Sequence, residues 1–124
     1  MSDSTDISAA KCEGSLIDLA VGSWRFSRLF LRVADKLDAS EAKRYSSQLR
    51  YFIKSIEDSL AINGLKLVNV EGMPFDPGMP VTALNVGDFG AEEELVVDQM
   101  VEPIVMGVGG LKRTGTVMLK GTRI

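Results

Sequence analysis

The sequence predicts an α+β protein: an N-terminal antiparallel helical hairpin that forms a dimeric four-helix bundle, followed by a small, mostly antiparallel β-domain. Three observations support this fold class. Apolar residues recur at spacings of three and four over residues 16–62, which is helical periodicity. Short apolar runs separated by turn residues follow residue 64 and are typical of strands. The stretch 72–80 contains three prolines and two glycines, which exclude a helix there.

Changes of composition divide the chain into three predicted segments. Residues 1–13 are small and polar, and we expect them to form a disordered tail. Residues 14–63 form the helical hairpin, and residues 64–124 form the β-domain. A chain of 124 residues is one domain, or a helical part joined to a small β part.

The first helix is expected from Ser15 to about Leu37. Its heptad seam consists of Leu16, Leu19, Ser23, Phe26, Phe30, Val33 and Leu37. More apolar residues lie beside the seam and favour a bundle over a two-stranded coiled coil: Ile17, Ala20, Trp24, Leu29 and Leu31. The same helix carries a basic ridge of Arg25, Arg28, Arg32 and Lys36. This ridge is either a solvated face, partly paired with acidic residues, or a dock for an acidic partner.

The second helix is expected from Ser40 to Ile62, with Asp38 as its N-cap and Asn63-Gly64 as its stop. The short connection makes the two helices antiparallel neighbours. They cannot cover each other's apolar surface, so we expect a homodimer; the alternative is a monomer whose β part folds back over the hairpin. The residues assigned to dimerisation are Leu19, Phe26, Phe30, Tyr45, Leu49, Phe52 and Ile56.

The β-domain is predicted to contain strands at 65–70, 81–86, 94–101, 103–108 and 114–120. Turns are expected at 87–90 and 107–110, and residues 91–94 should be acidic and exposed. Asp76-Pro77-Gly78 has the chemistry of a tight turn, since proline presets φ and the carboxylate can accept a backbone N–H. Phe75 is the one bulky side chain in this stretch, and we expect it to anchor the turn to the core.

The sequence offers little for catalysis. It has no histidine, which removes the commonest general base and the commonest metal ligand. The single cysteine, Cys12, therefore has no histidine to activate it. Asp76 beside Phe75 is the one acid–base candidate, and its turn role explains it more simply. We expect no enzyme activity, no cofactor and no metal.

Two charged segments resemble ligand sites only superficially. The glycines of 107–110 are followed by Leu111 rather than directly by a lysine, so a hairpin tip carrying two positive charges fits better than a phosphate loop. Glu92-Glu93-Glu94 with Asp98 lacks the ligand spacing of a calcium loop, and a solvated acidic loop is the simpler reading.

Charge and hydropathy limit the partners. The net charge of −3 argues against nucleic acid as the main partner. No apolar run reaches the length needed to span a membrane, and residues 1–11 lack a signal pattern, so we expect a cytoplasmic protein without a membrane partner.

The order of these features resembles the C-terminal part of GrpE, the nucleotide exchange factor of DnaK-type chaperones. The matching features are Asn63-Gly64-Leu65 after the hairpin, Met73-Pro74-Phe75-Asp76-Pro77 at the opening of the β-domain, and Arg113 followed by Val117 and Leu119. The resemblance covers roughly residues 15–120. The chain departs from the family where His-Glu-Ala usually follows the Asp-Pro turn, and where a later strand usually carries Gly-Tyr. The family's long N-terminal paired helix is also not expected, because only a short polar segment precedes Leu16.

The resemblance implies a mechanical function. In GrpE one β-domain of the dimer enters the nucleotide-binding cleft of the chaperone and holds it open, so that ADP leaves. The resemblance thus implies a DnaK-like ATPase as partner. The residues it assigns to partner binding are Phe75, Asp76, Pro77, Val81, Leu84, Lys112 and Arg113. The alternative is a dimeric adaptor of GrpE-like shape that binds another protein without exchange activity.

Overall fold

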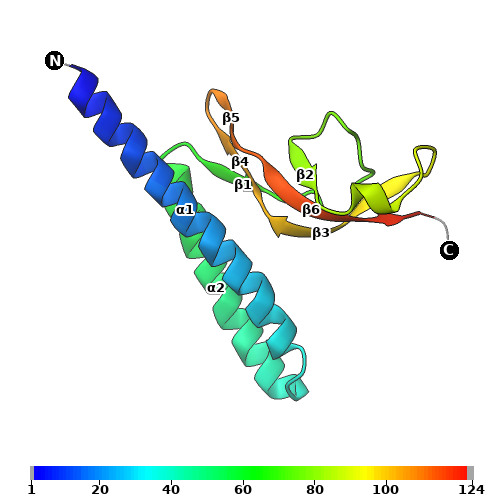
Figure 1. The fold of residues 1–124 in the computed structure, drawn as a ribbon. Helices are drawn as coiled ribbons and strands as arrows, with labels where there is room; N and C mark the ends of the chain where they lie inside the picture. The colour runs from blue at the N-terminus through cyan, green and yellow to red at the C-terminus, as the bar shows by residue number, and fades with distance from the viewer. Residues whose placement is uncertain (1, 123–124) are drawn as a thin grey trace. The chain divides into compact units, whose positions relative to one another are not determined.

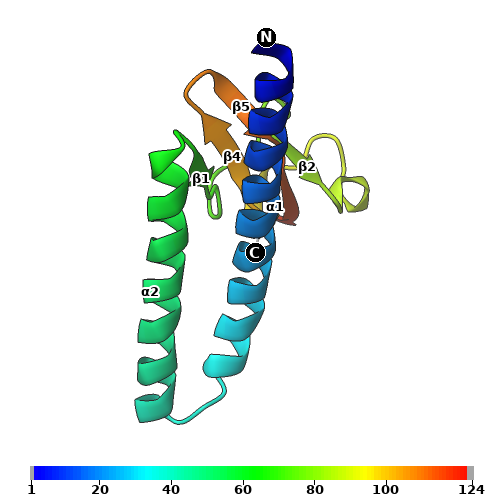
Figure 2. The same cartoon turned by 90° about the vertical axis from the view of Figure 1, so that its left-hand side faces the viewer.

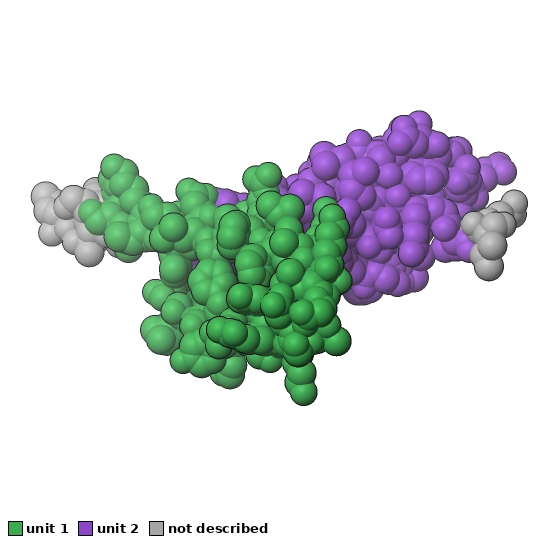
Figure 3. Space-filling view, turned by 90° about the horizontal axis from the view of Figure 1, so that it is seen from below, with its two compact units in different colours: residues 1–63 green, residues 64–124 purple. Residues whose placement is uncertain are grey.

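The computed structural model describes the backbone of residues 2–122 and the side chains of residues 7–122. The chain divides into two compact units, Met1–Asn63 and Gly64–Ile124 (Figure 3). The first unit is helical and the second is built from strands, as Figure 1 shows. The predicted α+β class is confirmed, with the change from helix to strand at Gly64.

The helical unit is an antiparallel hairpin of α1 (Ser2–Ala34) and α2 (Ala39–Ile62), seen side by side in Figure 2. Asp38 caps α2 as predicted, because its carboxylate oxygen Oδ1 accepts the Glu41 backbone N–H at 3.0 Å. Asn63 closes the other end, and its backbone N–H donates to the carbonyl of Leu60 at 2.9 Å. Gly64 then adopts a left-handed φ of 70°, the conformation that ends many helices.

The expectation that residues 1–13 are disordered is wrong for the part that the structure describes. The helix α1 already begins at Ser2, and the described side chains of residues 7–12 are exposed on it. Ala9, Ala10 and Lys11 are strong helix formers, so this segment continues the helix of Ser15–Ala34 without needing a core of its own. The helix also ends at Ala34, one turn earlier than expected.

The buried row of α1 lies one residue C-terminal to the predicted heptad seam, at Ile17 rather than Leu16 and at Ala20 rather than Leu19. The least exposed positions are Ile17, Ala20, Val21, Trp24, Ser27, Leu31 and Ala34. On α2 the corresponding row is Ala42, Ser46, Leu49, Ile53, Ile56 and Leu60. Several members of these rows are Ala or Ser, which let two helices approach closely, whereas Phe26, Phe30, Tyr45 and Phe52 lie outside the rows.

The β-unit is organised around one long antiparallel ribbon from Leu95 to Gly121. One arm is β3 (Leu95–Glu102) and β4 (Ile104–Gly107), and the other is β5 (Gly110–Arg113) and β6 (Gly115–Gly121). Strand β3 pairs with β6, and β4 pairs with β5 across a tip at Val108-Gly109. Gly107–Gly110 is therefore the predicted hairpin tip, but Gly110–Arg113 is a strand that the sequence reading missed.

Two short strands extend the ribbon, one beside β4 and the other beside β6. Strand β1 (Lys66–Val68) pairs antiparallel with β4, and β2 (Val81–Ala83) pairs parallel with β6. The sheet orders are thus β1-β4-β5 and β2-β6-β3, and the prediction of mostly antiparallel pairing is confirmed. Both flanking strands are shorter than predicted, and Val86 belongs to the 3₁₀ turn η1 (Val86–Asp88) rather than to a strand.

The core of the β-unit lies where the ribbon bends. Its most buried side chains are Leu65, Val97, Met100, Pro103, Ile104, Val105, Val117 and Leu119. Gly115 lies in the bend, and a Cβ built there would be 2.8 Å from Met100 Cε and 3.0 Å from the Glu102 carbonyl oxygen. A side chain at this position would therefore force Met100 and the Glu102 carbonyl to move.

The proline-rich stretch covers the free edge of β3. The N–H groups of Gly72 and Phe75 donate to the carbonyls of Val97 and Leu95, both at 2.8 Å, and Val97 N–H donates to the Met73 carbonyl at 2.9 Å. Pro74 lies between these bonds at an edge position, where its missing N–H costs nothing. The segment is therefore an irregular edge strand, followed by the Asp76 turn as predicted.

Candidate protein-binding surfaces

One side of the helical hairpin is an exposed apolar face. Leu19, Phe26 and Val33 repeat at every seventh position of α1 and are 70%, 61% and 54% exposed. Phe52 of α2 is 43% exposed and lines a groove between the two helices. The groove has a volume of about 240 Å³ and is lined by Leu16, Leu19, Ala20, Ser23, Phe52, Ser55, Ile56, Ser59 and Leu60.

An aromatic cluster continues this face toward the loop between the helices. Phe26 stacks on Phe30 with ring centroids 6.2 Å apart, and Phe30 meets Tyr45 edge-on at 6.3 Å. Groove and cluster together are called the outer face below, defined by Leu16, Leu19, Ser23, Phe26, Phe30 and Val33 of α1 and Tyr45, Phe52, Ser55, Ile56 and Ser59 of α2. None of these residues is charged.

The residues assigned to dimerisation occupy two positions on the hairpin. Leu19, Phe26, Tyr45 and Phe52 are exposed on the outer face. Phe30 and Ile56 are half-buried at its inner margin, and Leu49 belongs to the half-buried row of α2. Most of the residues assigned to dimerisation therefore lie on the exposed apolar side of the hairpin, whereas Leu49 lies in the row of α2 that corresponds to the buried row of α1.

The basic ridge lies on another side of α1. Helical geometry places Arg25 and Arg32 on the side away from the outer face, and both are exposed. Lys36 is also exposed but lies in the turn after the end of α1. Arg28 is half-buried, with its guanidinium 5.3 Å from the centre of the Trp24 ring.

The structure separates the predicted partner-binding residues into two groups. Lys112 is exposed and Arg113 half-buried on β5, an edge strand of the sheet β1-β4-β5. The lysine stem covers Gly107, because a Cβ there would be 2.6 Å from Lys112 Cε.

The other five predicted residues lie in or beside the sheet β2-β6-β3. Val81 lies on β2 and is half-buried, and Leu84 follows it and is 61% exposed. Phe75 is half-buried, in line with the expected anchor, whereas Asp76 and Pro77 are exposed. The Asp76 side chain makes the predicted turn, since its Oδ1 accepts the Gly78 N–H at 2.9 Å.

A cleft of about 760 Å³ lies beside Phe75 and Pro77. Its apolar lining also includes Pro74, Val86, Phe89, Leu95 and Val96. Glu93 and Glu94 form part of its rim. We call this feature the Phe75 cleft.

Hydrogen bonds fix both walls of the Phe75 cleft. On one side, the bond from Phe75 N–H to Leu95 ties the proline-rich segment to β3. On the other side, the Asn85 side chain makes two hydrogen bonds to the backbone of Leu119, as a neighbouring strand would. Its Nδ2 donates to the Leu119 carbonyl at 2.9 Å, and its Oδ1 accepts the Leu119 N–H at 2.8 Å. The loop from Val86 to Phe89 starts from this anchored residue, so the cleft is formed before any ligand arrives.

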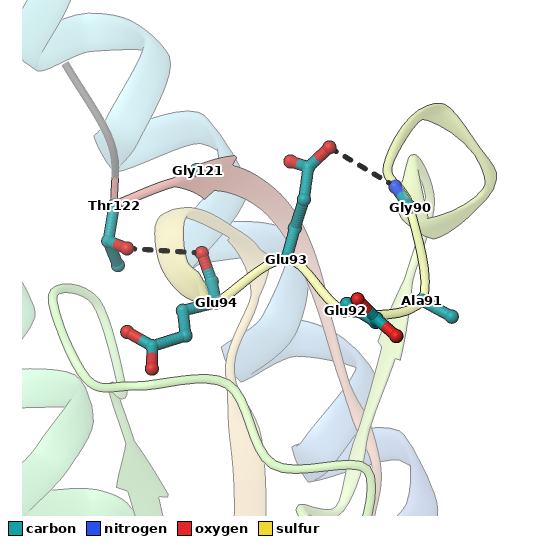
Figure 4. Close-up of a pocket in the computed structure, with 7 residues that line it drawn as sticks. All are labelled: Gly90, Ala91, Glu92, Glu93, Glu94, Gly121 and Thr122. Atoms are coloured by element: carbon teal, nitrogen blue, oxygen red, sulfur yellow. Dashed lines mark hydrogen bonds between the residues drawn. The ribbon is translucent and has the colours of Figure 1, made fainter.

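The acidic loop 90–94 separates the cleft from a second hollow of about 610 Å³, drawn in Figure 4. The Glu93 carboxylate accepts the Gly90 N–H at 3.3 Å, and the Thr122 hydroxyl donates to the Glu94 carbonyl at 3.3 Å. The side chains of residues 91–94 are exposed, as predicted. Among the described side chains of residues 7–122, no group of three or more acidic or cysteine side chains is arranged to hold a metal ion.

Of the residues that line the cleft, the sequence assigns only Phe75 and Pro77 to a site. The sequence predicts Val86 in a strand, Phe89 in a turn, and Leu95 and Val96 in a strand, without a binding role for any of them. One signal could have pointed to this region: the chain has no lysine or arginine from Leu67 to Leu111, but eight acidic residues.

Comparisons with known proteins add no relative. No protein-family model, no curated protein and no solved structure matches this chain. Among the helices of the described residues, none is long and apolar enough to cross a membrane.

Proposed function

We propose that the protein is a non-catalytic, dimeric protein-binding factor that acts like GrpE: it binds a DnaK-like ATPase and promotes nucleotide release. The exposed outer face of the helical hairpin is the observation that supports a dimer. Exposed Leu19, Phe26 and Phe52 follow the heptad period on both helices, and no charged residue interrupts them. A second copy offers the same surface and would complete a four-helix bundle.

The case for exchange activity rests on the resemblance in sequence. A helical hairpin ending at Gly64, an Asp76-Pro77 turn and a following β-unit occur in the same order as in GrpE. In this proposal the β-unit prefers the open, nucleotide-free state of the ATPase, and nucleotide must then weaken its binding by the same factor. The proposal keeps the cytoplasmic location expected from the sequence.

A second candidate is a dimeric adaptor without exchange activity. The same outer face supports its dimer, and the altered positions after the Asp-Pro turn, where Met79-Pro80 replaces the family's usual residues, favour it over an exchange factor. The two candidates differ in one property: an exchange factor binds according to nucleotide state, whereas the adaptor ignores it.

The dimer is tested by light scattering coupled to gel filtration. We expect about twice the chain mass of 13.4 kDa for the wild type and the single-chain mass for Phe52→Asp, because the carboxylate would be buried without a partner at the bundle seam. Tyr51→Asp is the matched control, since Tyr51 is 76% exposed and does not line the groove. A wild type that stays monomeric at high concentration would refute the dimer.

The exchange activity is tested by release of a fluorescent ADP analogue from DnaK-like ATPases of the source organism. Faster release with the wild type, and loss of the effect with Lys112→Glu/Arg113→Glu at unchanged circular dichroism, is the expected result. A folded dimer that leaves release unchanged on each of them would reject the exchange factor and favour the adaptor.

A further inference from the structure

The Phe75 cleft combines an apolar interior with an acidic surround. Phe75, Phe89 and Leu95 are half-buried in its lining, and Val86 is 50% exposed. These side chains offer a surface for one or two apolar side chains of a ligand, and the volume of about 760 Å³ accommodates them.

The charge around the cleft has one sign. Glu93 and Glu94 line it, Glu92 lies beside them, and Asp76 and Asp88 are exposed in the two segments that form its walls. None of its lining residues is basic. On the neighbouring strand β6, Lys120 is held in an ion pair with Asp98 at 3.5 Å.

We propose that the Phe75 cleft binds a segment of another protein in which an aliphatic or aromatic side chain is flanked by lysine or arginine. The apolar side chain enters between Phe75 and Phe89, and the flanking cations lie along the acidic loop. Since both walls are held by hydrogen bonds, little ordering cost is expected on binding. The inference stands on this cleft alone and holds whether or not the protein exchanges nucleotide.

The test is fluorescence polarisation of the full-length protein with a labelled peptide that has a Leu-Phe pair at its centre and two arginines on each side. Saturable binding is expected, with affinity that falls as salt rises. Two control peptides replace Leu-Phe by serines or the arginines by glutamates, and both should bind more weakly. Equal binding of the serine peptide would overturn the proposal, because it would show attraction by charge alone.

Two variants locate the binding. Val86→Arg puts a cation into the cleft at a position that is already half exposed, and should weaken binding about tenfold. Its control is Val108→Arg at the ribbon tip, where the side chain is 94% exposed and outside the cleft. Glu92→Gln/Glu94→Gln should weaken binding roughly threefold and reduce its salt dependence, whereas Glu41→Gln/Glu57→Gln on α2 should not.

Backbone amide NMR spectra decide between the cleft and other surfaces. Shifts on titration of the arginine peptide should concentrate at Phe75, Phe89 and the acidic loop. No saturable binding, unchanged binding by both cleft variants, or shifts confined to the outer face of the helices would each overturn the proposal.

Discussion

Asn85 should contribute more to stability than any other polar side chain between β2 and β3, because its amide pairs with both backbone groups of Leu119 in place of a neighbouring strand. Its amide makes two bonds of 2.9 and 2.8 Å to the backbone of Leu119, whose side chain is 3% exposed. A net hydrogen bond contributes about 0.5–1.5 kcal/mol, and an unsatisfied backbone group in a part-buried site costs about 1–3 kcal/mol. Asn85→Ala should therefore lower the free energy of unfolding by about 2–3 kcal/mol.

The measurement is urea unfolding followed in the β-unit itself. The only tryptophan, Trp24, reports on the helices, so the methyl NMR signals of Val97 and Val117 are the better probes. Asn85→Gln should be destabilising as well, because the longer side chain cannot place its amide at both bonds.

The matched control is Leu84→Ala, which truncates an exposed neighbour and keeps the bond from the Leu84 N–H to the Val117 carbonyl. It should change stability by less than about 0.5 kcal/mol. A loss below that value for Asn85→Ala as well would show that the Leu119 backbone finds other partners, and would refute the reasoning.

Two further predictions concern the bend of the ribbon and the helix cap. Gly115→Ala should cost about 1–3 kcal/mol in the same urea assay, because its Cβ would meet Met100 and the backbone, whereas Gly87→Ala, with nothing within 4 Å, should be nearly neutral. The hydrogen bond from the Glu41 N–H lowers the pKa of Asp38 below its ordinary value of 3.8, so its charge stabilises the folded state above that pH and the gain is lost as the pH falls through the lower folded pKa. Thermal melts should therefore show the wild type more stable than Asp38→Asn at neutral pH, with the difference shrinking below pH 3.8; a constant difference would contradict this.

The sequence was sufficient for features that depend on local chemistry. Asp38 as a cap, Gly64 as a helix stop and the Asp76 turn each follow from a side chain acting on a backbone a few residues away. These were predicted and are confirmed.

The phase of the helix pairing could not be predicted in this way. Two rows of α1 satisfy the same heptad spacing, one with Leu19 and Phe26 and the other with Ile17 and Trp24. Periodicity gives the spacing of the apolar residues but does not show which row packs against α2. In the structure the buried row is the one that contains the small Ala20.

The Phe75 cleft was also beyond prediction, because it depends on partners far apart in the chain. Asn85 reaches Leu119, and Phe75 pairs with Leu95, across intervals that no local pattern encodes. What the sequence did contain was the acidic bias of residues 67–111, which indicates a charged surface without showing where its apolar counterpart lies.

The ribbon from Leu95 to Gly121 also has a consequence for the order of folding. Its strands are joined by a two-residue tip at Val108-Gly109, so they can zip together from that tip with little loop-closure entropy. Strand β2 runs parallel to β6 and can dock only once β6 is in place, and the edge segment 72–75 similarly needs β3. The ribbon is therefore the template on which the flanking segments assemble, and the walls of the Phe75 cleft are among the last parts of the β-unit to form.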